Sequence, residues 1–198
     1  MEKTYSKTRI LVECAIMVAL ATVLSLLKVW EAPLGGSVTV VSMVPIILVS
    51  YRHGVKWGIE SALVYSVLQL LLGIGTISYV PTFWGIVLCA LFDYIIAFTL
   101  VGIAGIYKGV IKNDYVGVTV GAATSCVLRF LSHVVSGAIV WYEITKEGQW
   151  NDYVNRFGMW TYSVIYNAWY MVPETIITVV ATPIIFVVIN LIEKRRAK

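Results

Sequence analysis

Long apolar segments recur along the whole of this 198-residue chain, and charged residues rarely interrupt them. Hydrophobic residues make up 59% of the chain and charged residues only 13%, whereas a soluble domain carries about 25% charged residues. So few charges cannot cover a soluble surface of this size. The chain is therefore predicted to be an all-α integral membrane protein that forms one domain over residues 1–198.

Six segments are apolar over a length that suits a membrane-spanning helix, which needs about 20 residues. They cover residues 10–27, 38–50, 54–72, 83–106, 116–141 and 174–192. The second is short and contains Pro45, so we expect it to be kinked, tilted or not fully spanning. The sixth follows Pro173, which suits the first position of a helix, and Glu174 would then lie in a first turn that favours negative charge. The sequence thus predicts a bundle of six transmembrane helices.

Basic residues predict the orientation of this bundle. If the N-terminus is cytoplasmic and all six segments cross, the outer side holds only three basic residues, Lys28, Lys146 and Arg156. The inner side then holds eleven: Lys3, Lys7, Arg9, Arg52, Lys56, Lys108, Lys112, Lys194, Arg195, Arg196 and Lys198. Cytoplasmic loops carry an excess of Lys and Arg, so both termini are expected in the cytoplasm. Segments 28–37, 73–82 and 142–172 would face outward.

Residues 159–174, which read MWTYSVIYNAWYMVPE, combine five Trp and Tyr residues with Asn167 and Glu174. Trp and Tyr anchor helices at the lipid interface. The same residue types at the entrance of a helix also make a pocket for a flat, polar small molecule. The segment alone leaves both interpretations open.

Polar residues inside two apolar segments favour a cavity. Ser125, Arg129, Ser132, His133 and Ser136 fall within an arc of about 100° on a helix over residues 116–141. Asp93 lies deep in segment 83–106, and ionisable groups in a bilayer usually face the interior of a bundle. Either Asp93 and Arg129 form a buried pair that fixes helix packing, or one or both contact a ligand.

Small residues predict close helix contacts in two other segments. Gly58, Ser61, Tyr65 and Gln69 share one face of segment 54–72, which we interpret as packing. Ala15 and Ala19 form a small-residue strip on the first segment, which packs either inside the bundle or against another membrane protein. Ala19-Leu20-Ala21 also resembles a signal-peptidase site, but the apolar run continues to Leu27, which favours a retained helix.

Motifs that would indicate an enzyme are missing from the sequence. It contains no G-x-x-x-x-G-K-[ST] phosphate loop, no H-E-x-x-H pair and no G-x-S-x-G elbow. Cys14, Cys89 and Cys126 lie far apart in apolar segments and suggest neither a disulfide framework nor a metal site. We therefore expect a binding subunit with no catalytic residues, no metal, no cofactor and no nucleic-acid partner.

Several motifs, in order, resemble the ThiT family, the thiamine-specific S components of energy-coupling factor (ECF) vitamin transporters. They are the Ala15-x-x-x-Ala19 strip, the segment GGSVTVVSMVPIILVSYRHGVKWG at residues 35–58, the Asp93-Tyr94 pair, the His133 to Trp141 spacing, and Tyr162 to Asn167 leading to YMVPE. The resemblance covers nearly the whole chain and implies a vitamin site near the outer surface among the last three helices.

This resemblance implies six ligand contacts. They are Asp93, Tyr94, His133, Trp141, Tyr162 and Asn167. Better-known members carry Glu where this chain has Asp93, and the shorter side chain must approach the ligand differently or act through water. Trp and Tyr faces attract a cation such as thiazolium with about 0.5–2 kcal/mol per contact. Because a free positive charge would repel that cation, we expect Arg129 to be structural or paired with a carboxylate.

The resemblance also implies partners for a protein of the bacterial cell membrane. An S component binds its vitamin, here thiamine, and docks on an ECF module of one membrane scaffold protein and two ATPase subunits. Ala15 and Ala19 would form the docking contact. The alternatives are an S component for another vitamin or a thiamine precursor, a ligand-free accessory protein, and an intramembrane enzyme that uses Asp93 and His133.

Overall fold

A computed structural model describes residues 6–33, 35–149 and 152–196, with the backbone alone for Arg196. The predicted positions of Lys3, Lys198 and the Arg196 side chain therefore lie outside the described residues. The elements are α1 (Lys7–Leu26), β1 (Lys28–Glu31), β2 (Ser37–Thr39), α2 (Val44–His53), α3 (Val55–Leu72), α4 (Ile74–Ile77), α5 (Phe83–Cys89), the π-helical η1 (Ala90–Ile96), α6 (Ala97–Thr99), the 3₁₀-helical η2 (Leu100–Tyr107), α7 (Asp114–Ser136), the π-helical η3 (Gly137–Trp141), α8 (Tyr142–Glu147), α9 (Tyr153–Arg156) and α10 (Met159–Arg196).

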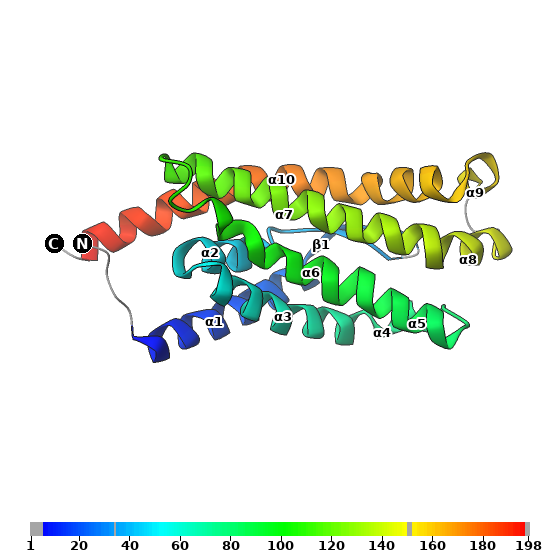
Figure 1. Ribbon diagram of the computed structural model, residues 1–198, viewed down its shortest axis with the longest axis horizontal. Coiled ribbons are helices and arrows are strands. Elements are labelled where there is room, and N and C mark those ends of the chain that lie inside the picture. The colour runs from blue at the N-terminus through cyan, green and yellow to red at the C-terminus, as the bar shows by residue number, and fades with distance from the viewer. Residues whose placement is uncertain (1–5, 34, 150–151, 197–198) are drawn as a thin grey trace.

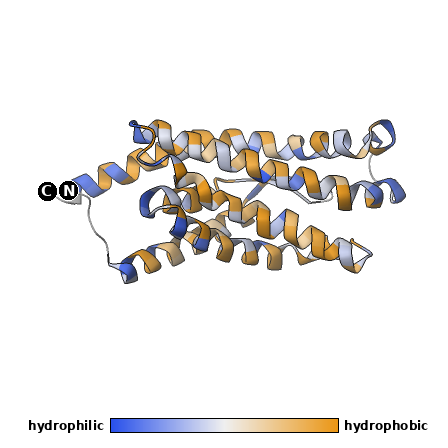
Figure 2. Cartoon of the chain, viewed as in Figure 1, coloured by the Kyte–Doolittle hydropathy of each residue, from blue (hydrophilic) through white to orange (hydrophobic). Residues whose placement is uncertain are grey.

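Helices run side by side along the long axis of the molecule (Figure 1). Over the residues that the structure describes, five helical segments are long and apolar enough to cross a membrane: α1, α3, the rod from α5 to η2, the rod from α7 to α8, and α10. Apolar residues cover the helices between their ends, and hydrophilic residues gather at the two ends of the bundle (Figure 2). This arrangement confirms an all-α membrane protein.

The second predicted helix, over residues 38–50, is wrong as a continuous helix. Its first residues form β2, which pairs antiparallel with β1 in a hairpin. The helix begins only at Val44, where Pro45 suits a first turn. Val38 and Thr39 are β-branched and favour the strand. α2 has ten residues, so it is about 15 Å long and too short to cross a hydrocarbon core of about 30 Å.

The predicted start of the last helix is also wrong. α10 has 38 residues, begins at Met159 and carries Pro173 and Pro183 in its interior. Glu174 is therefore not in a first turn. Segment 142–172, predicted as an outer loop, forms α8, α9 and the first part of α10. Pro173 removes only one backbone donor, and a helix packed along a membrane bundle tolerates that loss.

α1 and α10 are the first and last long helices of the chain. α1 begins and α10 ends at the same end of the molecule (Figure 1). Together, the β1–β2 hairpin and the short helix α2 return the chain toward the end at which α1 begins, and α3 follows from there (Figure 1). Which side of the membrane this end faces stays a prediction.

Inward and outward faces are distinct on α1 and α3. Ala15 and Ala19 lie on the exposed face of α1, whereas Cys14 and Val18 are buried. The small-residue strip therefore does not pack inside this bundle. On α3, the predicted packing face is confirmed: Gly58 approaches the Gly102 backbone so closely that a Cβ atom would collide with it.

Candidate ligand-binding site

A cavity of about 210 Å³ lies between the β-hairpin and helical segments from both halves of the chain. All six residues predicted as ligand contacts line it: Asp93, Tyr94, His133, Trp141, Tyr162 and Asn167. Further lining residues include Gly36, Tyr65, Arg129, Ser163, Tyr166, Tyr170 and Glu174. The structure thus brings the sequence-predicted residues together on one concave wall.

Two π-helical segments position the polar centre of this wall. Asp93 lies in η1 and Trp141 ends η3. A π-helical turn closes one residue later than an α-helical turn, so it rotates the following side chains relative to a regular helix. Such segments are frequent at functional sites. A regular period of 100° per residue cannot predict this rotation.

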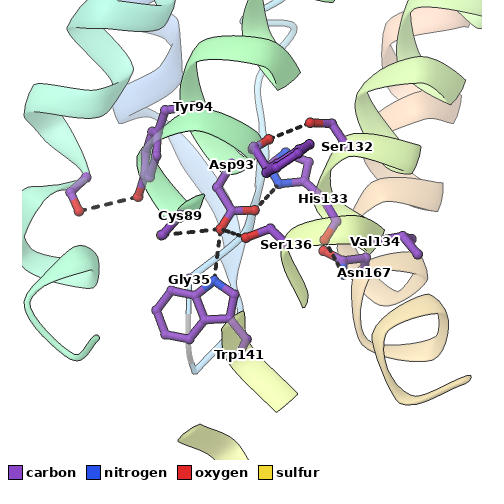
Figure 3. Close-up of polar contacts among 12 residues, drawn as sticks. Gly35, Cys89, Asp93, Tyr94, Ser132, His133, Val134, Ser136, Trp141 and Asn167 are labelled. Atoms are coloured by element: carbon purple, nitrogen blue, oxygen red, sulfur yellow. Dashed lines mark hydrogen bonds and ion pairs between the residues drawn. The ribbon is translucent and has the colours of Figure 1, made fainter. Parts of the chain in front are cut away.

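Asp93 accepts hydrogen bonds from several donors, which we call the Asp93 cluster: Cys89, His133, Ser136 and Trp141 (Figure 3). Ser136 Oγ and Trp141 Nε1 donate to Oδ2 over 2.6 and 2.8 Å. His133 Nδ1 lies 3.0 Å from Oδ1, and the Cys89 thiol lies 3.4 Å from Oδ2. Donors from α5, α7 and η3 therefore hold the carboxylate in place before any ligand arrives.

The anticipated Asp93–Arg129 pair does not form. Within the described residues, no carboxylate oxygen lies within 4.0 Å of the Arg129 guanidinium. Arg129 instead lies over the Phe98 ring at 4.5 Å, and its Nη1 is 3.1 Å from Met43 Sδ. The polar stripe of α7 is confirmed as an inward face, because all five of its predicted residues are buried.

His133 and Asn167 differ in their free hydrogen-bonding capacity. His133 Nε2 is buried and has no hydrogen-bond partner among the described residues, so it is available to a ligand. Asn167 Nδ2 donates to the Ser163 carbonyl over 2.9 Å, and Asn167 Oδ1 accepts from the Tyr170 hydroxyl over 2.6 Å. A ligand contact of Asn167 would therefore use the remaining lone pair of Oδ1.

Residues 159–174 contribute aromatic side chains from α10 to the cavity wall. Tyr162 and Tyr170 of α10 are buried and line the cavity, whereas Trp160 and Trp169 are 50% and 67% exposed. The ring centroids of Tyr162 and Tyr166 lie 6.0 Å apart at 30°. The aromatic side chains of residues 159–174 therefore divide between the cavity wall and the exposed surface of the same helix.

Sequence reasoning missed the role of Glu174 in the fold. It is 1% exposed, lines the cavity and accepts two hydrogen bonds from Thr39 of β2, from the backbone N–H over 2.6 Å and from the hydroxyl over 2.7 Å. This contact joins the hairpin to α10. A carboxylate at the start of an apolar segment that continues to Ile192 could have indicated a buried role for Glu174. The sequence analysis instead placed Glu174 in the first turn of a helix.

The charges around the cavity suit a ligand with one positive charge. Among the described lining residues, Asp93 and Glu174 carry two negative charges and Arg129 one positive charge. At the rim, Lys28 and Glu31 neutralise each other in an ion pair of 2.6 Å. With His133 counted as neutral, the wall has one negative charge in excess. Together with its Tyr and Trp faces, it fits a flat cation that bears hydrogen-bonding groups.

Comparisons with known proteins show the family to which the chain belongs. Residues 11–194 match the model of the thiamine transporter protein (Thia_YuaJ) family. The chain is 33% identical over 187 residues to the thiamine transporter ThiT of Bacillus subtilis, covering 89% of each chain. It is 25% identical over 160 residues to the thiamine transporter ThiT of Lacticaseibacillus paracasei, covering 74% of this chain and 71% of that protein.

A solved structure has the same fold. ThiT from Listeria monocytogenes superposes with a TM-score of 0.69 at 21% sequence identity. The superposition covers 96% of this chain and 97% of that chain. The fold described above is therefore also found in a solved structure.

Proposed function

We propose that this chain, which belongs to the thiamine transporter protein (Thia_YuaJ) family, binds thiamine from the outer side of the membrane as the S subunit of an ECF transporter. The observation that carries this proposal is the Asp93 cluster, a partly buried carboxylate held by three N–H and O–H donors on the wall of an aromatic cavity. Membership of a transporter family also confirms that the chain is a multi-pass membrane transport protein and not an enzyme.

The chemistry of thiamine matches the two kinds of wall. Its aminopyrimidine has an amino group with two N–H donors, one for Asp93 and one for the lone pair of His133 Nε2, which accepts when Nδ1 of the neutral ring donates to Asp93. Its thiazolium carries a permanent positive charge, which the faces of Trp141 and Tyr162 attract. We assign Tyr94 and Asn167 to the same site, where they border the ring system. A pocket with several buried polar groups rejects analogues that leave those groups unpaired.

A titration of the purified chain with thiamine tests this function. Binding should quench or enhance tryptophan fluorescence saturably, because Trp141 lines the cavity, and calorimetry should give the same affinity. A chain that binds a thiamine precursor or another vitamin instead would be an S component of different specificity. A chain that binds none of these ligands would be an accessory protein, and the proposal would be wrong.

Coupling to an ECF module is the second part of the proposal. Ala15 and Ala19 are exposed on α1 and form a smooth strip between larger exposed residues such as Leu11 and Ile16. Small residues permit close approach of a partner helix in a membrane. We propose that a scaffold protein carrying two ATPases docks there and that both termini of this chain lie in the cytoplasm.

Bulk on this strip should separate binding from transport. We predict that Ala15→Trp abolishes thiamine uptake into cells that express the scaffold and ATPases, while the affinity of the purified variant for thiamine changes less than about two-fold. Val64→Trp is the control, because Val64 is also exposed (55%) but lies on α3 and not on α1. If Ala15→Trp transports as well as Val64→Trp, the docking surface lies elsewhere.

A further inference from the structure

The sequence of α1 contains one carboxylate, Glu13, although this helix is apolar enough to cross a membrane. A charge inside a membrane-spanning helix is costly and normally has a partner. Glu13 lies in the second turn of α1, about 18 Å along the helix axis from Ser25, which lines the cavity. It is therefore near the end of the bundle where α1 begins and α10 ends (Figure 1). Neither the ligand contacts nor the docking strip explains this carboxylate.

Two residues at the end of α2 contact the Glu13 carboxylate. Arg52 Nε lies 3.4 Å from Oε1, and His53 Nε2 lies 3.1 Å from Oε2. Arg52 also forms an ion pair through Nη2 with Glu193 of α10. We call Glu13, Arg52, His53 and Glu193 the Glu13 network. It joins α1 to α2 and α10, and it engages both oxygens of Glu13.

The end of α2 belongs to the packed part of the bundle. Arg52 and His53 lie in the last turn of α2, where the helix dipole favours positive charge. The His53 side chain is only 3% exposed, and Lys108, which follows η2, donates from Nζ to the Arg52 carbonyl over 2.9 Å. Gly54 ends α2 with φ of +97° and leads directly into α3. The partners of Glu13 are therefore fixed by neighbouring elements.

Apolar packing alone fixes the rotation of α1 weakly. Four of its 20 residues are buried: Cys14, Val18, Ala21 and Ser25. Because lipid tails are as apolar as the side chains of the helix, burial against the bundle gives little preference over lipid. Polar contacts therefore distinguish one rotation of α1 from another. The Glu13 network supplies such contacts near the start of α1, and Ser25 accepts a hydrogen bond from Gln69 of α3 over 2.8 Å near its end.

The docking strip lies on the opposite side of α1 from Glu13. At 100° per residue, Ala15 and Ala19 point about 160° and 120° away from Glu13 around the helix axis. Contacts that hold Glu13 against α2 therefore turn the two alanines outward, as the structure shows. A rotation of α1 would replace the alanines with larger neighbours such as Ile16 and prevent the close approach of a partner helix.

We propose that the Glu13 network positions α1 for docking, because it fixes the rotation at which Ala15 and Ala19 face the scaffold protein. This inference rests on the proposed function, since it takes the strip as the docking contact. Glu13 and Arg52 are positioning residues that act on transport through α1. Binding of thiamine uses the cavity and should not depend on the network.

Uptake and binding measured on three variants test this role. Glu13→Gln removes the charge, and Glu13→Asp retains it. Glu60→Gln is the control, because Glu60 is an exposed carboxylate of α3 that forms no ion pair within the described residues. Thiamine uptake into cells that express the scaffold and ATPases is measured per folded chain in the membrane. Calorimetry gives the affinity of each purified variant for thiamine.

Glu13→Gln should lower the maximum rate of uptake at least about five-fold, while the thiamine affinity and the concentration for half-maximal uptake change less than about two-fold. Glu13→Asp should restore most of the rate, because the long Arg52 side chain can follow a carboxylate shorter by one methylene. Glu60→Gln should transport like the wild type. An unchanged rate in Glu13→Gln, an equal loss in Glu60→Gln, or an affinity that falls as much as the rate would each overturn the proposal.

Spin labels measure the position of α1 without transport. Val12 of α1 and Val188 of α10 are 54% and 48% exposed, and Val12→Cys and Val188→Cys would carry the labels, since the three native cysteines are buried. The distribution of distances between the labels should broaden in Glu13→Gln and stay narrow in Glu60→Gln. Equal distributions in both would overturn the proposal.

Arg52→Gln gives a second way to break the network. It removes the Arg52 contacts of both Glu13 and Glu193, so it should lower the uptake rate and broaden the label distances even if Glu13→Gln does not fold. A wild-type rate and a narrow distribution in Arg52→Gln would overturn the proposal. If the wild type binds no thiamine, the proposed function fails, whereas the label distances still test whether the network positions α1.

Discussion

Asp93 and Arg129 line the same cavity, but their charged groups are partnered in different ways. The Asp93 carboxylate accepts hydrogen bonds from α7 and η3 at 2.6–3.0 Å. The Arg129 guanidinium rests on an aromatic ring and a thioether, and its Nε is unpaired among the described residues. Short hydrogen bonds from the protein fix the Asp93 carboxylate, whereas the Arg129 guanidinium contacts an aromatic face and a thioether.

The charged groups of Asp93 and Arg129 therefore differ in how firmly hydrogen bonds fix them. Donors that hold Asp93 in place would lower the reorganisation needed when the amino group of the proposed ligand arrives. Arg129 makes no comparable set of hydrogen bonds among the described residues, because Phe98 covers one face of its guanidinium and the Met43 thioether is a weak acceptor.

Removing the Asp93 charge should have the largest effect on the affinity for thiamine. Asp93→Asn is expected to weaken thiamine binding about 100-fold or more, roughly 3 kcal/mol, because a neutral amide also opposes the donors of Ser136 and Trp141. Ser136→Ala, which keeps the charge, should weaken binding less. Calorimetric affinities of the three proteins check this. Unchanged affinity in Asp93→Asn would show that the carboxylate does not serve the ligand.

Glu174 should matter more for stability than for ring binding. Glu174→Gln is expected to lower the free energy of unfolding by about 1.5–3 kcal/mol, because two donors of Thr39 lose a buried carboxylate. Glu193→Gln, in the same helix, should lower it by less than about 1 kcal/mol, because Glu193 is 43% exposed in its pair with Arg52. Thermal unfolding in detergent compares the two. Equal losses would mean that Glu174 does not anchor the hairpin.

The hairpin offers the smallest expected effect. Gly36 and Gly109 both have positive φ, of +89° and +79°, so Ala at either position strains the backbone by about 1–2 kcal/mol. At Gly36 the new Cβ would also meet the Tyr170 ring, whereas nothing lies within 4 Å at Gly109. Tyr170 bonds Asn167 over 2.6 Å, so Gly36→Ala should weaken thiamine binding about ten-fold. Gly109→Ala should leave the affinity unchanged, and a similar loss in both variants would separate the hairpin from the site.

Part of the cavity wall was predictable because its residues repeat along a helix, whereas Asp93, Tyr94, Trp141, Tyr162 and Asn167 were expected as ligand contacts from the resemblance. His133 and the serines of α7 fall on one inward face, and a period of 3.6 residues places such residues reliably. Ala15 and Ala19 were identified as a strip by the same periodicity, but only the packing of α1 shows that the strip faces outward. The predictions failed where the helix is not regular or does not end where composition changes.

The structure differs from the sequence-based predictions at three such places. The strand at Ser37–Thr39 replaced a predicted helix, because its hairpin partner is not visible in hydropathy. Pro173 was interpreted as a helix start, although it lies inside α10, where neighbouring helices stabilise the continuous rod. η1 and η3 rotate Asp93 and Trp141 toward each other, and such a rotation depends on packing across the bundle.

The sequence by itself determined a helical membrane protein and the inward polar face of α7, because hydropathy and residue period are local properties of the chain, and its motif order pointed to six residues that line one cavity. Only the tertiary structure decided how the charges are partnered. It joined Asp93 to His133 and Trp141 instead of Arg129, and Glu174 to Thr39 across 135 positions. Partners are selected by which helices approach each other in space, and that is a property of the whole bundle.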